Sequence, residues 1–127
     1  MHLTWIESHA TALGAPDFDY CAYGVEGWVE LKAGPDFEIR PSQVAWFRDR
    51  LAAGGYPLFL VYWGDTFMVI PGGQALALRG DPSEENALRL ASSRWHGWIP
   101  DREFLRVLRN PRGEYERTER NIREAGQ

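Results

Sequence analysis

The sequence predicts an α/β domain in which a mixed β-sheet carries a helix on one face and a helical C-terminal extension follows. Three observations support this fold class. Short apolar runs of strand length alternate with glycine- and proline-containing turns before Gly73. Residues 42–53 carry apolar side chains at helical spacing. After Gly73 the pattern becomes helical, and a helix packed on a mixed sheet is the natural way for this order of elements to close a core.

The first part of the chain is expected to form a β-hairpin. Residues 3–8 are ambiguous between strand and helix. Gly14-Ala15-Pro16-Asp17 is a turn signal, and residues 18–23 then have the composition of a strand. Residues 24–27 would connect that strand to a second one at residues 28–33.

The glycine- and proline-containing segment that follows is expected to be a loop, and a helix is expected at residues 42–53. Val44, Phe47 and Leu51 recur at helical spacing along that segment. Pro41 precedes it, and Gly54-Gly55 terminates it.

A second hairpin and several helices are expected in the remainder. Residues 57–63 form a strongly apolar strand, and a Gly64-Asp65 turn joins it to a strand at residues 66–70. The segments with a helical pattern are residues 74–79, 83–94 and 101–109. From Pro111 onward the chain is charged and has few apolar anchors, so we expect a tail.

Length and composition fit one ordinary globular domain. The chain has 127 residues, of which 44% are hydrophobic and 25% charged. We therefore treat residues 1–73 as the core and residues 74–127 as a helical C-terminal extension of the same domain. We see neither an apolar run of membrane-spanning length nor a signal peptide, so we expect a cytoplasmic protein with no membrane partner. Cys21 is the only cysteine, which excludes an intrachain disulfide, and the three histidines show no zinc-ligand spacing.

The charge pattern leaves two interpretations open. The net charge of −4 counts against a nucleic-acid binder, which usually carries a basic face. All but one of the 14 basic residues are arginine, however, and most of the arginines lie between Arg79 and Arg123, interspersed with acids. That region is either a solvated helical surface or a phosphate-contacting face. The one lysine is Lys32, which stands two residues after Glu30.

Strand geometry places Glu30 and Lys32 together. Side chains alternate along a strand, so Trp28, Glu30 and Lys32 share one face. The residues on the other face are Val29, Leu31 and Ala33, an apolar set that suits a core. If the two strands of the hairpin pair, Asp17 lies beside Glu30 or Lys32. Two carboxylates suit a hard cation such as Mg²⁺, and an adjacent ammonium suits a developing negative charge. The alternative is a half-exposed hairpin with a cross-strand ion pair.

At these residues the sequence resembles a known family. The segment GAPDFDYCAYGVEGWVELKAG resembles the PD-(D/E)xK nuclease superfamily, and within it the small phage-type nucleases of the VRR-NUC group. These proteins have Gly-x-Pro-Asp, a strand and turn, then Glu-x-Lys, then a helix that opens with a glutamine. Here Arg40-Pro41-Ser42-Gln43 opens the next helix. The resemblance covers roughly residues 5–70 and implies a restriction-endonuclease-like fold.

The resemblance assigns roles to individual positions. Asp17 and Glu30 match the metal-binding carboxylates, and the backbone carbonyl of Leu31 would be a further metal ligand. Lys32 matches the lysine that positions or activates the water. Gln43 matches the glutamine that points back at the site, and its alternative is an ordinary solvent-facing residue of the first helical turn.

Two further acids, Glu7 and Asp36, lie near the same pattern. Glu7 is ten residues before Asp17, with little chain ahead of it for the leading helix that relatives possess. It is either a metal ligand from a first strand or a surface charge. Asp36 belongs to a second Pro-Asp pair, but it follows the Glu-x-Lys strand and is interpreted as a loop residue.

The function implied by the resemblance is hydrolysis of phosphodiester bonds by an endonuclease that requires Mg²⁺ or Mn²⁺. Phage relatives imply DNA as the partner, in particular branched DNA such as a Holliday junction, in the cytoplasm of a bacterium or a phage-infected host. A two-fold homodimer would suit symmetric cleavage of a junction. The alternative is a non-catalytic module of the same fold that binds nucleic acid or protein.

Overall fold

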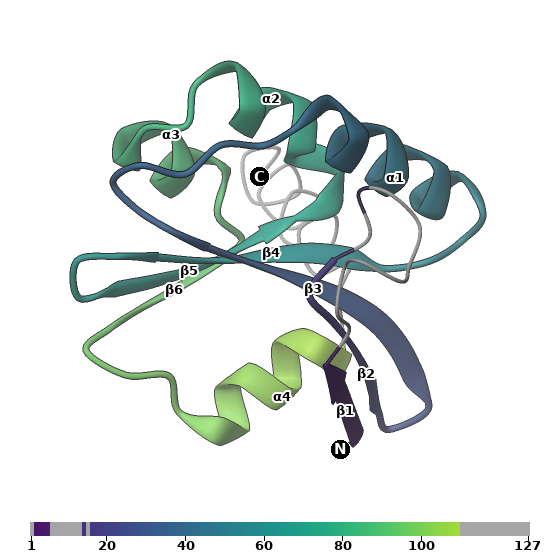
Figure 1. Cartoon of the computed structure of the whole chain (residues 1–127). Helices are drawn as coiled ribbons and strands as arrows, with labels where there is room; N and C mark the ends of the chain where they lie inside the picture. The colour runs from purple at the N-terminus through teal and green to yellow at the C-terminus, as the bar shows by residue number, and fades with distance from the viewer. Residues whose placement is uncertain (1, 6–13, 15, 110–127) are drawn as a thin grey trace, which may run out of the picture.

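Six strands form one mixed β-sheet in which the spatial order β1-β2-β3-β4-β5-β6 is also the order along the chain (Figure 1). The computed structural model describes residues 2–5, 14 and 16–109. The strands are β1 (His2–Trp5), β2 (Phe18–Ala22), β3 (Val25–Ala33), β4 (Pro57–Trp63), β5 (Thr66–Pro71) and β6 (Ser93–His96). The helices are α1 (Pro41–Ala52), the 3-10 turn η1 (Gly72–Gln74), α2 (Ala75–Gly80), α3 (Glu84–Leu90) and α4 (Asp101–Arg109).

Strands β3 and β4 are the one parallel pair in the sheet, and the other neighbouring strands run antiparallel. A parallel connection needs a crossover, and α1 supplies it. The predicted α/β class with a mixed sheet is therefore confirmed. The segments predicted at residues 42–53, 57–63, 66–70 and 101–109 correspond to α1, β4, β5 and α4.

The first hairpin turns at a different place from the one expected. The turn consists of Tyr23 and Gly24, both with positive φ (53° and 78°), and β3 already begins at Val25. Two residues with positive φ match the right-handed twist of the flanking strands. Gly27 is a strand residue whose missing side chain makes room for Tyr20, since a Cβ there would lie 2.4 Å from the Tyr20 hydroxyl oxygen.

The helix predicted at residues 83–94 is wrong in its second half. Helix α3 starts as expected, with the Ser83 hydroxyl accepting from the Asn86 N–H at 3.2 Å, but it ends at Leu90. Ala91 is extended (φ −65°, ψ 135°), and the Ser92 N–H donates to the Val69 carbonyl at 2.9 Å. The chain then pairs with β5 as strand β6, because an unpaired strand edge offers more backbone hydrogen bonds than an extra helical turn. The C-terminal extension is therefore not purely helical.

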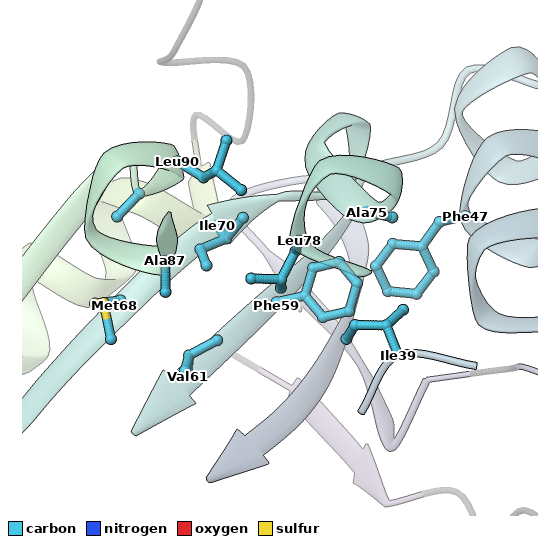
Figure 2. Close-up of a cluster of buried hydrophobic side chains, with 11 residues drawn as sticks. Ile39, Phe47, Phe59, Val61, Met68, Ile70, Ala75, Leu78, Ala87 and Leu90 are labelled. Carbon is cyan, nitrogen blue, oxygen red and sulfur yellow. The ribbon is translucent and has the colours of Figure 1, made fainter. Parts of the chain in front are cut away.

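Helices cover both faces of the sheet. Figure 1 shows α1, α2 and α3 on one face and α4 on the other. Side chains alternate along β4, so this strand contributes to the apolar clusters on both faces of the sheet. Phe59 and Val61 point to the α1 side and Leu58 to the α4 side. Figure 2 shows the cluster beneath α1, α2 and α3, which is formed by Ile39, Phe47, Phe59, Val61, Met68, Ile70, Ala75, Leu78, Ala87, Leu90 and Ala91.

A smaller cluster lies under α4 and contains Tyr20, Ala22, Val29, Leu58, Val69 and Leu108. It accounts for only part of the apolar face predicted for β3. Val29 is fully buried there, but Leu31 is 40% exposed and Ala33 is exposed. The expectation that all three pack in a core is thus wrong for Leu31 and Ala33, since the cover provided by α4 reaches only the first part of the strand.

Residues 74–109 pack against the sheet formed by the earlier residues and extend it by one strand. The charged tail predicted from Pro111 lies outside the described residues. Among the helices that the structure describes, none combines the length and apolarity that a bilayer-spanning helix requires.

Two leucines on α2 test this packing. Leu78 is fully buried and Leu76 is 67% exposed. We expect Leu78→Ala to lower the free energy of unfolding by about 2–5 kcal/mol, because it leaves a cavity in the cluster of Figure 2. Leu76→Ala, the control on the same helix, should change it by less than about 0.5 kcal/mol. Urea unfolding followed by circular dichroism measures both, and equal effects would contradict the packing described here.

Candidate metal and catalytic site

The Gly14-x-Pro16-Asp17 segment is anchored on the start of α1. Gly14 has a φ of 87°, and a Cβ at this position would lie 2.2 Å from the Ser42 carbonyl oxygen, so only glycine fits. Pro16 is fully buried. Gly14 therefore lies against the first turn of α1, and Asp17 comes directly before β2.

Asp17 bonds to the backbone of β3. The β2–β3 register ends with Phe18 opposite Val29. Two residues further along β3, the Leu31 N–H donates to the Asp17 carboxylate Oδ2 at 2.7 Å. The carboxylate oxygen thus accepts the hydrogen bond that a backbone carbonyl would accept if β2 were longer. This bond holds Asp17 against β3.

The Leu31 carbonyl belongs to the same edge of β3. The N–H groups of Trp28 and Gly34 donate to the carbonyls of Tyr56 and Tyr62. The backbone groups of the even-numbered residues of β3 therefore point toward β4. The N–H and C=O of one strand residue point to the same edge. Since the Leu31 N–H points at Asp17, its carbonyl lies on the Asp17 side as well.

Glu30 and Lys32 project from β3 toward α1. In the parallel register Glu30 stands beside Phe59 and Lys32 beside Val61, two residues of the cluster under α1. Glu30 is only 5% exposed, and its Oε2 lies 3.3 Å from the Lys32 Nζ. The two charges therefore form a largely buried ion pair.

Gln43 links these groups to the helix. Its Nε2 donates to Glu30 Oε2 at 2.6 Å, and its Oε1 accepts from Lys32 Nζ at 3.3 Å. The same oxygen accepts from the Arg40 backbone N–H at 2.9 Å, which satisfies a donor at the start of α1. Gln43 is itself buried. Of its two predicted alternatives, the solvent-facing residue is wrong, and the side chain points at Glu30 and Lys32.

Burial and the neighbouring carboxylate perturb Glu30. Desolvation is the largest cause and Asp17 the next, and together they raise the pKa of Glu30 from 4.5 to about 7 against the opposing effect of Lys32. Asp17 acts both through its charge and through a side-chain hydrogen bond to Glu30. The two carboxyl groups are therefore direct neighbours in the folded protein.

These donors suit a hard divalent cation. Two adjacent carboxylates and a backbone carbonyl are oxygen ligands of the kind that Mg²⁺ and Mn²⁺ prefer. A cation bound by Asp17 and Glu30 would relieve the repulsion that raises the Glu30 pKa. Among the described residues, no group of three His, Cys, Asp or Glu side chains is arranged to hold a metal. Glu7, the predicted third carboxylate, lies outside the described residues.

One neighbouring feature was not anticipated from the sequence. The Arg50 guanidinium lies 4.7 Å from the Trp46 ring centroid and 5.2 Å from that of Trp28. Trp28 shares the Glu30 face of β3, and Trp46 lies one turn after Gln43 on α1, so this cation–π cluster holds α1 against β3 beside the site. The sequence indicates this arrangement through the spacing of Gln43, Trp46 and Arg50, which places the three side chains on one face of α1. Asp36 is exposed in the loop after β3, as interpreted.

The raised pKa of Glu30 predicts how the free energy of unfolding depends on pH. The Glu30 carboxyl binds its proton more tightly in the folded protein than in the unfolded chain. Protonation of Glu30 therefore adds its full contribution to the free energy of unfolding below about pH 4.5, and this contribution is lost as the pH rises through about 7. Glu30→Gln lacks this term. In EDTA, the unfolding free energy of the variant minus that of the wild type should therefore rise between pH 5 and pH 8, by on the order of 2 kcal/mol.

Urea titrations at each pH measure this difference, and the other titrating groups cancel between the two proteins. Adding Mn²⁺ at pH 8 should stabilise the wild type more than Glu30→Gln, and the stabilisation should weaken below pH 7 as protons compete. A difference that stays flat with pH would contradict the perturbed carboxyl.

Two comparisons of the sequence with known proteins gave no match. No family model matches the sequence, and no curated protein is significantly similar to it. The assignment of the site therefore depends on its own geometry and on the resemblance of its motifs.

Proposed function

We propose that this protein is a metal-dependent nuclease of the PD-(D/E)xK type, with a restriction-endonuclease-like fold, that hydrolyses phosphodiester bonds in DNA. The observation that carries the proposal is the convergence of three charged side chains. Asp17 and Glu30 interact directly, Lys32 lies 3.3 Å from Glu30, and Gln43 binds the last two.

The carboxylates and the ammonium divide the chemistry between them. Asp17, Glu30 and the Leu31 carbonyl would hold Mg²⁺ or Mn²⁺. A bound cation supplies charge stabilisation for the phosphate and lowers the pKa of a water molecule. Lys32 supplies a fixed positive charge beside the carboxylates, where it orients the attacking water or offsets negative charge that develops on the phosphate.

Gln43 is a positioning residue in this scheme. Its amide holds the Glu30 carboxylate and the Lys32 ammonium in one geometry, while its link to Arg40 fixes the amide to the backbone. Partial burial of Glu30 and Lys32 strengthens their electrostatic effect on a bound phosphate, because less water screens it.

Branched DNA, a two-fold homodimer and a bacterial or phage-infected cytoplasm complete the proposal, as the phage-type resemblance implies. A dimer would present two sites to the symmetric strands of a junction. Cleavage of a four-way junction in preference to linear duplex, together with a dimer mass in solution, would support these finer points.

Substitution of the catalytic groups tests the site. We expect Asp17→Ala and Lys32→Ala each to lower the rate of DNA cleavage in Mg²⁺ or Mn²⁺ by about 100-fold or more, because each removes a group that stabilises the transition state. Asp36→Ala is the matched control, since Asp36 also follows a proline but is exposed in the loop after β3. EDTA should abolish cleavage.

The assay uses labelled plasmid, linear duplex and four-way junction, with folding of each variant checked by circular dichroism. Full activity in both Asp17→Ala and Lys32→Ala would falsify the site assignment. Absence of cleavage of any nucleic acid by the wild type would favour the non-catalytic binding module instead.

The role of Gln43 is tested separately. Gln43→Leu keeps the bulk of the side chain but removes its three hydrogen bonds. We expect cleavage to fall about 10- to 100-fold and the metal concentration for half-maximal rate to rise, because Glu30 loses the group that orients it. If the half-maximal metal concentration and the pH profile both match the wild type, Gln43 has only a structural role.

A further inference from the structure

Helix α4 carries an arginine face that the proposed reaction does not use. Arg102, Arg106 and Arg109 are exposed and stand at positions i, i+4 and i+7, which places them on one side of the helix. The opposite side of α4 packs on the sheet through Leu108, Phe104 and Val107. The arginines therefore form a row that faces solvent.

This row borders an open groove of about 520 Å³ between α4 and the β2–β3 turn. The residues that line it are Tyr23, Asp101, Arg102, Leu105, Arg106 and Arg109. Tyr23 is 71% exposed, and the Arg109 guanidinium lies 5.5 Å from the centroid of its ring. The groove thus combines three guanidinium groups with an exposed aromatic ring.

Among the described residues, no acid forms an ion pair with an arginine of the groove. Within the described part of the chain, the ion pairs are Lys32–Glu30 and Arg48–Asp49, and neither involves α4. Of the described residues that line the groove, one is an acid, Asp101, and three are arginines. Such a concentration of positive charge stands out in a chain whose net charge is −4.

We propose that this groove, lined by Tyr23, Arg102, Arg106 and Arg109, binds the sugar-phosphate backbone of a second segment of the nucleic-acid substrate. From Arg102 to Arg109 the helix rises about 10 Å, so the arginine row is long enough to contact more than one phosphate of a strand. Guanidinium groups bind phosphate through two parallel hydrogen bonds, and Tyr23 offers a surface on which a base stacks.

The position of the groove identifies the segment it would bind. The catalytic side chains face α1, whereas α4 covers the other face of the sheet (Figure 1). Asp17 and Tyr23 stand at opposite ends of β2, about 20 Å apart for six strand steps. A straight duplex lying on one face does not reach both places, but a second arm or a single strand that passes the sheet edge does. The inference rests on the proposed function for the identity of the ligand, but it does not require cleavage.

The test measures DNA binding without cleavage. The probes are a fluorescent four-way junction, a linear duplex and a single strand, titrated in EDTA over a range of salt concentrations. Arg102→Gln/Arg106→Gln removes two charges from the groove. Arg79→Gln/Arg94→Gln is the matched control, because it removes two exposed arginines outside the groove. Arg102→Lys/Arg106→Lys retains the charge.

We expect the glutamine variant of the groove to bind the junction at least 10-fold more weakly, with the slope of log K against log salt reduced by about 1.5–2. The control should match the wild type, and the lysine variant should keep the salt slope. Wild-type affinity and slope in the glutamine variant overturn the proposal, as does equal loss in the control.

The same proteins separate this proposal from the proposed function. If the wild type cuts DNA in Mn²⁺ while the groove variant binds and cuts like it, the groove proposal fails and the nuclease stands. If the groove variant loses binding but the wild type never cuts, the groove stands and the nuclease fails. Tighter binding of an acidic peptide than of any DNA, lost in the groove variant, would overturn the groove proposal.

Discussion

Gln43 satisfies the hydrogen-bonding needs of a buried ion pair and of a helix start at the same time. Its amide nitrogen donates to Glu30, and its amide oxygen accepts from Lys32 and from the Arg40 backbone. Without Gln43, Glu30 and Lys32 would still pair with each other, but each would lose one hydrogen-bond partner in a largely buried place, a loss of about 1–3 kcal/mol. The carboxamide of glutamine offers both functions from one planar group.

Two features of the fold bring Gln43, Glu30 and Asp17 together. The crossover from β3 through α1 to β4 brings the helix start over the end of β3. The missing side chain of Gly14 allows its backbone to approach Ser42, and Asp17, three residues later, is held against β3. The carboxylate that results next to Glu30 is unfavourable for the isolated protein, since it raises the Glu30 pKa. A fold that retains such a repulsive pair is typical of a site that binds a cation.

The candidate site and the arginine groove lie on opposite faces of the sheet. Glu30 and Lys32 stand beside the cluster under α1, while the outer side of α4 presents three exposed arginines. Of the two interpretations left open for the arginine-rich region, the groove beside Tyr23 favours phosphate contact for this part of α4. The remaining arginines after Arg109 lie outside the described residues.

Local pattern was enough to predict the α/β class, most strands and α1, because alternation and helical spacing directly reflect which side of an element is buried. It also predicted that Glu30 and Lys32 share a face, and that Asp17 lies beside them once the hairpin pairs. The existence of β6, the exposure of Leu31 and the inward direction of Gln43 were decided by the tertiary structure alone. Each depends on a partner far along the chain: the free edge of β5, the limited reach of α4, and the crossover that sets α1 over β3. Such partners leave no periodic signal in the segment that they determine, so only the folded chain reveals them.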